Sequence, residues 1–319
     1  MIFCSRALRL RRNQGEYMKD SLHDYIRPGL VHFMAYPACM GGDGPVLETV
    51  SALCGDPFFE VLEITHIEED GVRNEVRAVA EEARVQLCYG AQPILLGGKL
   101  DLNHADETER QKAIDAVKGG IDEAASMGIG AVGLLSGKVS EDYDAAKARL
   151  VDSLDKLCTY GKAKNATIVL ETFDQVPYGK NCLIGPTQDA VEVSAHVRNF
   201  HSDFGLMLDL SHLPLIGEAS EAALNLAREH LVHVHIGNCA MDDPTHPAYG
   251  DNHPRFGAPG TRNDVPELAE FLKVLLDMGY LNREARKIVS FEVKPMAGES
   301  PEAVIAGSKR ALLEAWRRI

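Results

Sequence analysis

The 319-residue chain has few cysteines, and none of them is paired in the sequence. The seven cysteines include no C-x-x-C pair, and their number is odd. This pattern argues against a disulfide framework and for a reducing compartment. We therefore expect a cytoplasmic protein with small, mostly buried thiols.

The chain also lacks a long apolar segment. No apolar run approaches the roughly 20 residues of a membrane span, so we expect no membrane partner. The first 12 residues are basic but contain no continuous apolar stretch of the kind that a secretion signal needs. We expect residues 1–27 to form a peripheral or disordered extension, with Met18 as an alternative start of the protein.

Positive charge is scarce, with 33 lysines and arginines against 47 aspartates and glutamates, a formal net charge of −14. Such a surface repels the phosphate backbone of nucleic acids, so we expect no nucleic-acid partner. No G-x-G-x-x-G motif follows the first expected strand, which disfavours a dinucleotide-binding fold.

Short apolar runs alternate with longer amphipathic stretches after residue 28. Eight runs have the near-continuous Val/Ile/Leu character of strands in a covered parallel sheet. The expected strands are 29–35, 58–65, 85–90, 131–135, 167–171, 205–209, 231–235 and 287–292, and the expected helices are 70–83, 107–127, 142–163, 186–198, 219–229, 264–278 and 301–317. Eight such units predict an α/β fold, a (β/α)8 TIM barrel formed by residues 28–319 as one domain, with a doubly wound sheet as the alternative.

The last four expected strands each end on a residue that can bind a metal. These residues are Glu171, Asp209, His235 and Glu292. Because parallel neighbours bring their carboxyl ends together, the four side chains would converge on one point. Three carboxylates there would repel one another unless a cation neutralised them. Oxygen and imidazole ligands without thiolates favour Mn²⁺ or Mg²⁺, with Zn²⁺ or Co²⁺ as alternatives.

Further candidates lie close to these strand ends. His212 follows Asp209 by three residues, and His253 and Arg255 lie in the Gly/Pro-rich loop 236–262, where Arg255 could bind a substrate carboxylate or phosphate. His233 shares the side of the strand with His235 but lies one layer deeper, which favours a structural role.

Other polar residues follow the remaining strands and are expected to contact substrate. Glu63 and His66 end the second expected strand, Gln92 follows the third, and Lys294 follows Glu292 by two residues. Barrel enzymes place their substrates at this end of the strands.

The ordered ligands resemble those of the xylose isomerase-like TIM-barrel superfamily, which holds sugar isomerases and epimerases and the endonuclease IV relatives. The segments that carry the resemblance are Leu-Asp-Leu-Ser-His212, His233-Val-His235 and residues 256–264. The resemblance implies one divalent metal held by Glu171, Asp209, His235 and Glu292. It also implies that Glu171 and Glu292 act as an acid/base pair and that His212 contacts a substrate oxygen.

The sequence departs from the ketose 3-epimerase branch of this superfamily. Those enzymes place another glutamate six residues after the first ligand, where this chain has Pro177. The frequent His-x-Lys-Asp after strand seven is here His235-Ile-Gly-Asn238. The further histidine ligands of the endonuclease IV type are not identifiable from the sequence.

These observations leave three hypotheses. The first is a metal-dependent isomerase or epimerase that forms an enediolate from a keto-sugar or a sugar derivative. The second is a lyase that eliminates from, or decarboxylates, a 3-oxo sugar or sugar acid. The third is a non-catalytic barrel that binds a polyol. All three imply a small carbohydrate ligand, and the relatives that form dimers or tetramers suggest a homo-oligomer.

Overall fold

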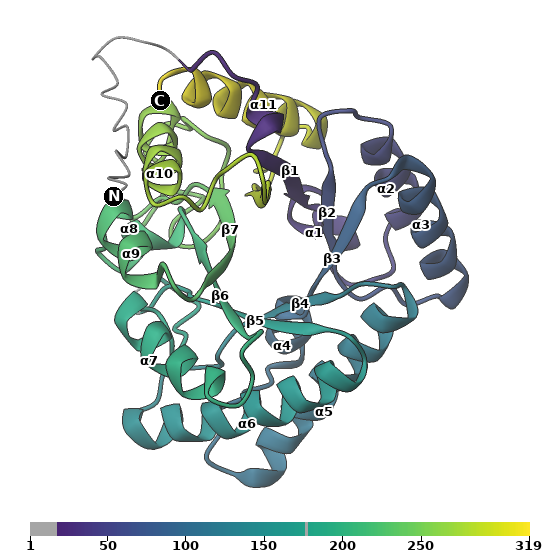
Figure 1. The fold of residues 1–319 in the computed structure, drawn as a ribbon, viewed down its shortest axis with the longest axis vertical. Coiled ribbons are helices and arrows are strands. Elements are labelled where there is room, and N and C mark those ends of the chain that lie inside the picture. Colours follow the sequence, from purple (N-terminus) through teal and green to yellow (C-terminus); the bar gives the residue numbers. More distant parts are fainter. Residues whose placement is uncertain (1–17, 176–177) are drawn as a thin grey trace, which may run out of the picture.

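A computed structural model describes residues 18–175 and 178–319. Its centre is a closed barrel in which eight strands pair in chain order, each parallel to its neighbours (Figure 1). The strands are β1 (Ile26–Val31), β2 (Val61–Ile64), β3 (Gln86–Gly90), β4 (Ala131–Leu134), β5 (Thr167–Glu171), β6 (Gly205–Asp209), β7 (Leu231–Gly237) and β8 (Lys287–Glu292). The predicted (β/α)8 barrel is confirmed.

Amphipathic helices surround the barrel and cover its outer face (Figure 1). They include α2 (Val46–Cys54), α3 (Asp70–Ala83), α5 (Glu107–Ser126), α6 (Tyr143–Ala163), α7 (Thr187–Arg198), α9 (Ser220–Ala227), α10 (Val265–Asp277) and α11 (Pro301–Arg317). Within the part of the chain that the structure describes, no helix combines the length and apolar character that a membrane crossing requires.

The start of the barrel differs from the sequence prediction. Strand β1 begins at Ile26 and ends at Val31, and the short helix α1 (His32–Ala35) follows it, whereas the sequence predicted a strand over 29–35. The amide of Tyr36 donates to the carbonyl of His32 and completes this helical turn. A short apolar run is compatible with either structure, so periodicity alone could not separate them.

Two further short helices lie in the loops at the carboxyl ends of the strands. Helix α4 (Gln92–Gly98) follows β3, and α8 (His212–Leu215) follows β6. Both are only one or two turns long, which is too short to show a reliable helical period in the sequence. They are important because α4 begins at Gln92 and α8 begins at His212, two of the predicted site residues.

Side chains on β8 show how the strands divide the interior from the outer layer. Phe291 is fully buried and packs against Phe58, Phe59 and Phe256 on the helix side. Its neighbours Ser290 and Glu292 therefore point into the barrel, because successive side chains alternate between the faces. Gly29 of β1 pairs with Ser290 of β8, and a Cβ atom at Gly29 would lie 2.2 Å from the Ser290 hydroxyl. Glycine at position 29 therefore leaves room for the Ser290 side chain.

Strand register brings the predicted ligands to one end of the barrel. Glu171 pairs with Met207, Asp209 pairs with His235, and Glu292 pairs with Gly237. The four ligand positions are therefore at nearly the same height on adjacent strands β5 to β8.

The amino terminus of α5 offers a test of how the helices are stabilised. The Asp106 carboxylate accepts from the amides of Thr108 and Glu109, at 2.8 and 3.1 Å. Replacing it by alanine leaves these amides without a side-chain acceptor, so we expect Asp106→Ala to lower the free energy of unfolding by about 1 kcal/mol. Denaturant titration measures this change. Asp115→Ala, on an exposed face of the same helix, should change the value by less than about 0.5 kcal/mol.

Candidate metal centre

Four buried side chains from consecutive strands meet at the carboxyl end of the barrel. Glu171, Asp209, His235 and Glu292 each offer one ligand atom, and these atoms all lie within 4.8 Å of one another. None of the four residues is more than 7% exposed. The structure thus brings together the ligand set that the sequence predicted.

The donor set fits a divalent cation. Glu171 Oε1 and Asp209 Oδ2 are buried side-chain oxygens without a hydrogen-bond partner. A buried carboxylate oxygen left in this way costs free energy unless an ion or water satisfies it. Three carboxylates and one imidazole supply the hard oxygen and nitrogen ligands that Mn²⁺, Mg²⁺, Co²⁺ or Zn²⁺ accept.

The imidazole of His235 is held from both sides. Its Nδ1 atom faces the other ligands, 2.7 Å from Glu292 Oε2 and 3.4 Å from Glu171 Oε1. Its Nε2 atom lies 3.1 Å from Glu63 Oε2, on the opposite side of the barrel interior. The ring is therefore oriented so that Nδ1 is the nitrogen available to an ion at this centre.

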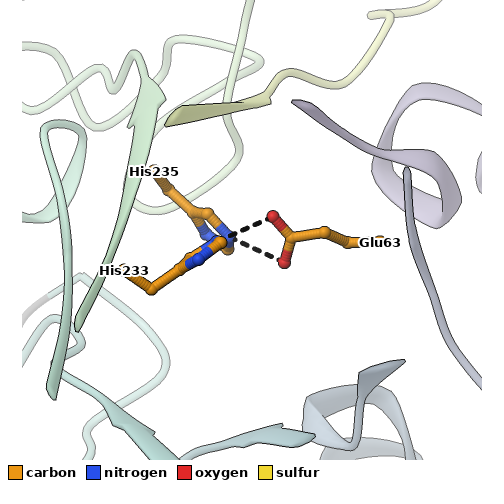
Figure 2. Close-up of side chains that lie close together, drawn as sticks. All are labelled: Glu63, His233 and His235. Carbon is orange, nitrogen blue, oxygen red and sulfur yellow. Dashed lines mark hydrogen bonds and ion pairs between the residues drawn. The ribbon is translucent and has the colours of Figure 1, made fainter. Parts of the chain in front are cut away.

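Glu63 joins two histidines of β7. It extends across the barrel interior from β2, and its two oxygens face the rings of His233 and His235 (Figure 2). The distance from Glu63 Oε1 to His233 Nε2 is 2.8 Å. Glu63 thus contacts a candidate ligand, and Glu63, His233 and His235 form a further group with the spacing of ion ligands. The structural role of His233 stays a prediction.

Charges in this group influence one another strongly. Burial alone would raise the pKa of Glu63, but the imidazoles of His233 and His235 hold it well below its ordinary value. Burial likewise opposes a charge on His235, yet Glu63 and the neighbouring glutamates raise the pKa of its imidazole well above the ordinary value. The surrounding carboxylates therefore favour the protonated form of the His235 imidazole.

A second buried network lies beside the four ligands. His212 and His253 both contact Asp251 Oδ1, at 3.0 and 2.6 Å, and His253 Nδ1 lies 3.6 Å from Asp209 Oδ2. Asp209, His212 and His253 form another group with the spacing of ion ligands. The ammonium of Lys180 lies 2.7 Å from Asp251 Oδ2 and supplies a fixed positive charge at the edge of this network.

The partners in this network determine its charge state. Burial would raise the pKa of Asp251, but Lys180, His253 and His212 hold it well below its ordinary value. Burial would lower the pKa of Lys180, but the carboxylate of Asp251 raises it. His212 is oriented by two bonds, because Nδ1 donates to the carbonyl of Thr172 at 2.7 Å while Nε2 faces Asp251.

A cavity of about 1000 Å³ opens above the centre, and Glu171, His235 and Glu292 lie in its wall. Of the residues expected to contact substrate, His66, Gln92 and Lys294 also line it. Gln92 Nε2 donates to Glu171 Oε2 at 2.7 Å, so it orients a candidate ligand. His66 Nδ1 lies 2.7 Å from Glu123 Oε2, and Glu123 also lines the cavity.

The remaining expected contacts lie elsewhere. His212 and His253 are fully buried and are not among the described residues that line the cavity. Arg255 is also outside that lining, and its guanidinium pairs with Glu299 at 2.9 Å. Pro177 lies outside the described residues.

Sequence reasoning missed Asp251 and Lys180. Asp251 lies two residues before His253 in the long loop after β7, and an Asp-x-His pair there is a signal that could have identified it. Lys180 lies in the loop after β5 and has no comparable signal. The sequence also did not indicate that His212 and His253 would lie together with Asp209.

The fold and the centre together define the class of this protein, a TIM barrel with a buried Glu/Asp/His/Glu cluster at the carboxyl ends of its strands. The sequence matches the model of the xylose isomerase-like TIM barrel family over residues 53–315. The chain belongs to this family. A comparison with curated protein sequences found no match.

Several solved structures share the fold along nearly their whole length. The D-psicose 3-epimerase from Clostridium cellulolyticum H10 has a TM-score of 0.67 and 19% identity, with 90% of this chain and 99% of that chain covered. The IOLI protein with a bound zinc atom has a TM-score of 0.70 and 17% identity, with 91% and 98% covered. The 3-keto-D-glucoside 4-epimerase YcjR from E. coli has a TM-score of 0.63 and 17% identity, with 90% and 98% covered.

Proposed function

We propose that this protein is a divalent-metal-dependent isomerase or epimerase of a keto-sugar or a sugar derivative. The observation that carries the proposal is the convergence of Glu171, Asp209, His235 and Glu292 on one point in the wall of a large cavity. The names of the similar structures, among them D-psicose 3-epimerase and 3-keto-D-glucoside 4-epimerase, support the same class of reaction.

The four residues of the centre would hold one ion. Mn²⁺ or Mg²⁺ suits the oxygen-rich ligand set best, and Zn²⁺ or Co²⁺ also suits it; zinc is the ion in the similar IOLI structure. When bound, the ion supplies Lewis-acid stabilisation of the negative charge that develops as a proton leaves the carbon next to a carbonyl.

Protein side chains would move the proton. Glu171 and Glu292 come from β5 and β8, on either side of β6 and β7, and both line the cavity, so they can approach a substrate from two directions. One glutamate, as the carboxylate, would remove the α-proton, and the other, in its protonated form, would deliver a proton to the opposite face or to the adjacent carbon. Gln92 keeps Glu171 oriented through its hydrogen bond. His212 donates to the carbonyl of Thr172 and contacts Asp251, and these two contacts hold its ring beside the four ligands.

A lyase is the second candidate, because Lys294 and Lys180 line the cavity. Lys180 is paired with Asp251, so Lys294 is the residue whose ammonium would attract the carboxylate of an oxo-sugar acid. A β-leaving group would depart after the same proton abstraction, whereas loss of CO₂ would itself generate the enediolate in place of that step. The absence of a glutamate at Pro177 also separates this chain from the ketose 3-epimerase pattern.

Metal binding is expected to release protons. The pKa of His235 is raised in the ion-free protein, so its imidazole is protonated below that raised value and must lose the proton to become a ligand. The affinity for Mn²⁺ should therefore fall as the pH is lowered through and below the pKa of His235. Calorimetric titration with Mn²⁺ in buffers of different ionisation enthalpy measures the release. A binding enthalpy independent of the buffer would contradict it.

An activity screen tests the proposed function and separates the two reactions. Keto-sugars and 3-oxo sugar acids are incubated with the protein and Mn²⁺, and products are analysed by mass and by chromatography. An isomer of unchanged mass supports the isomerase or epimerase, whereas loss of water, CO₂ or an aglycone indicates the lyase. Binding without any turnover would favour the polyol-binding barrel instead.

Location and assembly stay predictions. Six cysteines in the described part of the chain are free, which agrees with the expected reducing compartment and a cytoplasmic protein. Size-exclusion chromatography with light scattering would test for a homo-oligomer.

A further inference from the structure

Hydrophobic side chains make up part of the lining of the cavity above the centre. Val31, Phe33, Met34 and Met40 form a hydrophobic cluster separate from the main core, and all four line the cavity. Ile94 and Leu96 of α4 line it as well. We define these six residues, Val31, Phe33, Met34, Met40, Ile94 and Leu96, as the apolar lobe.

Leu96 shows that the lobe is open to a ligand. Its side chain is 40% exposed, although it lies in the wall of a cavity. Phe33 is buried, and a Cβ atom at Gly90 would lie only 3.0 Å from its ring, so glycine at that position leaves room for the ring. The lobe therefore combines a packed aromatic side chain with an exposed leucine.

Helix α4 connects the lobe to the metal centre. Gln92, at its start, hydrogen-bonds to Glu171, and Leu96 lies four residues later on the same face. Four residues of helix rise by roughly 6 Å. A ligand whose reacting carbon lies beside Glu171 would thus reach Leu96 with a substituent about as long as one aromatic ring.

A sugar ring alone does not suit the lobe. Nearly every carbon of a free sugar carries a hydroxyl group, and the six side chains of the lobe offer no conventional hydrogen-bond partner. A buried hydroxyl without a partner costs about 1–3 kcal/mol. The cavity of about 1000 Å³ also lies at the upper end of the range for drug-sized ligands, which are larger than a monosaccharide.

We propose that the natural substrate is an oxo-glycoside or similar keto-sugar derivative that carries an aromatic substituent, with the keto-sugar at the metal centre and the aromatic ring in the apolar lobe. Methionine sulfur and phenylalanine contacts favour an aromatic ring over a branched alkyl group. This inference rests on the proposed function for the placement of the sugar, and it adds the class of substrate.

Matched probes test the proposal on the full chain loaded with Mn²⁺. Phenyl β-D-glucoside and methyl β-D-glucoside differ only in the substituent, and calorimetry gives the dissociation constant of each. Burial of one aromatic ring should make the phenyl glucoside bind about ten- to a hundredfold more tightly. Equal affinities, or no measurable binding of the phenyl glucoside, would overturn the proposal.

Variants of the lobe show whether its residues contact the aromatic ring. Leu96→Gln and Met40→Gln introduce a polar group of similar length and should each reduce the phenyl advantage at least fivefold, while binding of the methyl glucoside changes little. Leu226→Gln is the control, because Leu226 is 44% exposed on α9 and is not among the described residues that line the cavity. A phenyl advantage that survives in both lobe variants would assign the ring to another place and overturn the proposal.

A parallel assay separates this inference from the proposed function. The unmodified protein is incubated with free keto-sugars and with 3-oxo glycosides in heavy water, and deuterium incorporation is followed. Incorporation without a phenyl advantage would retain the proposed function and reject the aromatic substrate. A phenyl advantage lost in the lobe variants, without incorporation into any keto-sugar or 3-oxo glycoside, would support the lobe and reject the proposed reaction.

Discussion

A protein that carries Glu171→Gln and Asp209→Asn together is expected to lose its stoichiometric divalent ion. The two substitutions remove two of the three carboxylate charges from the centre and leave one carboxylate and one imidazole. Both residues also hold the buried oxygens that have no other partner, so an amide cannot replace their contribution. The loss should be complete after dialysis against buffer without metal.

Elemental analysis of the dialysed protein measures the ion content. The matched control is Glu218→Gln with Asp189→Asn, which changes the net charge equally but lies outside the centre, since Glu218 accepts from Thr187 and Asp189 accepts from Tyr143. The control should retain one ion per chain. Full occupancy in the Glu171/Asp209 variant would show that the ion lies elsewhere.

Replacing Glu63 by glutamine is expected to weaken metal binding about 10- to 100-fold without removing any ligand. A carboxylate that accepts from the far nitrogen of a ligating histidine fixes the orientation and the tautomer of the ring. Glu63 has this relation to His235 Nε2 and, through its other oxygen, also holds His233. The amide of glutamine has only one oxygen and can accept from only one of the two rings.

The affinity for Mn²⁺ is measured over a series of pH values in this variant and in Glu218→Gln. The pH series is necessary because Glu63 also raises the pKa of His235. Replacing Glu63 therefore makes the proton of His235 easier to remove, which favours metal binding, while it also loosens the orientation of the ring, which weakens metal binding. At high pH, protons no longer compete with Mn²⁺ for His235. The limiting affinity there therefore reports only the effect of ring orientation. An unchanged limiting affinity in Glu63→Gln would show that the ring is positioned by β7 alone.

The candidate centre was largely predictable because its four candidate ligands lie at the ends of short apolar runs, and these runs form consecutive strands. Glu171, Asp209 and Glu292 each end a hydrophobic run, and parallel pairing then brings the strand ends together. The family resemblance rests on the same four residues and their order. For these positions, strand identity and strand order were sufficient.

The remaining parts depend on the closed barrel. Glu63 and His235 are 172 positions apart in sequence and meet across the interior, a contact that strand patterns alone do not encode. Lys180 reaches Asp251 from a different loop. Helix α4 is too short to be recognised from its sequence period. That one helix carries both Gln92 and Leu96 is therefore known only from the structure of the loop after β3. Loop conformation, rather than strand order, places these residues.

The most direct test of the central claim is exchange of the substrate's α-proton in heavy water. The dialysed protein is mixed with a panel of keto-sugars and 3-oxo glycosides, with and without Mn²⁺, and deuterium at the carbon next to the carbonyl is followed by NMR. The account predicts incorporation into at least one substrate that depends on Mn²⁺ and is lost in the Glu171/Asp209 variant. Equal incorporation by that variant, or no incorporation into any member of the panel, would contradict it.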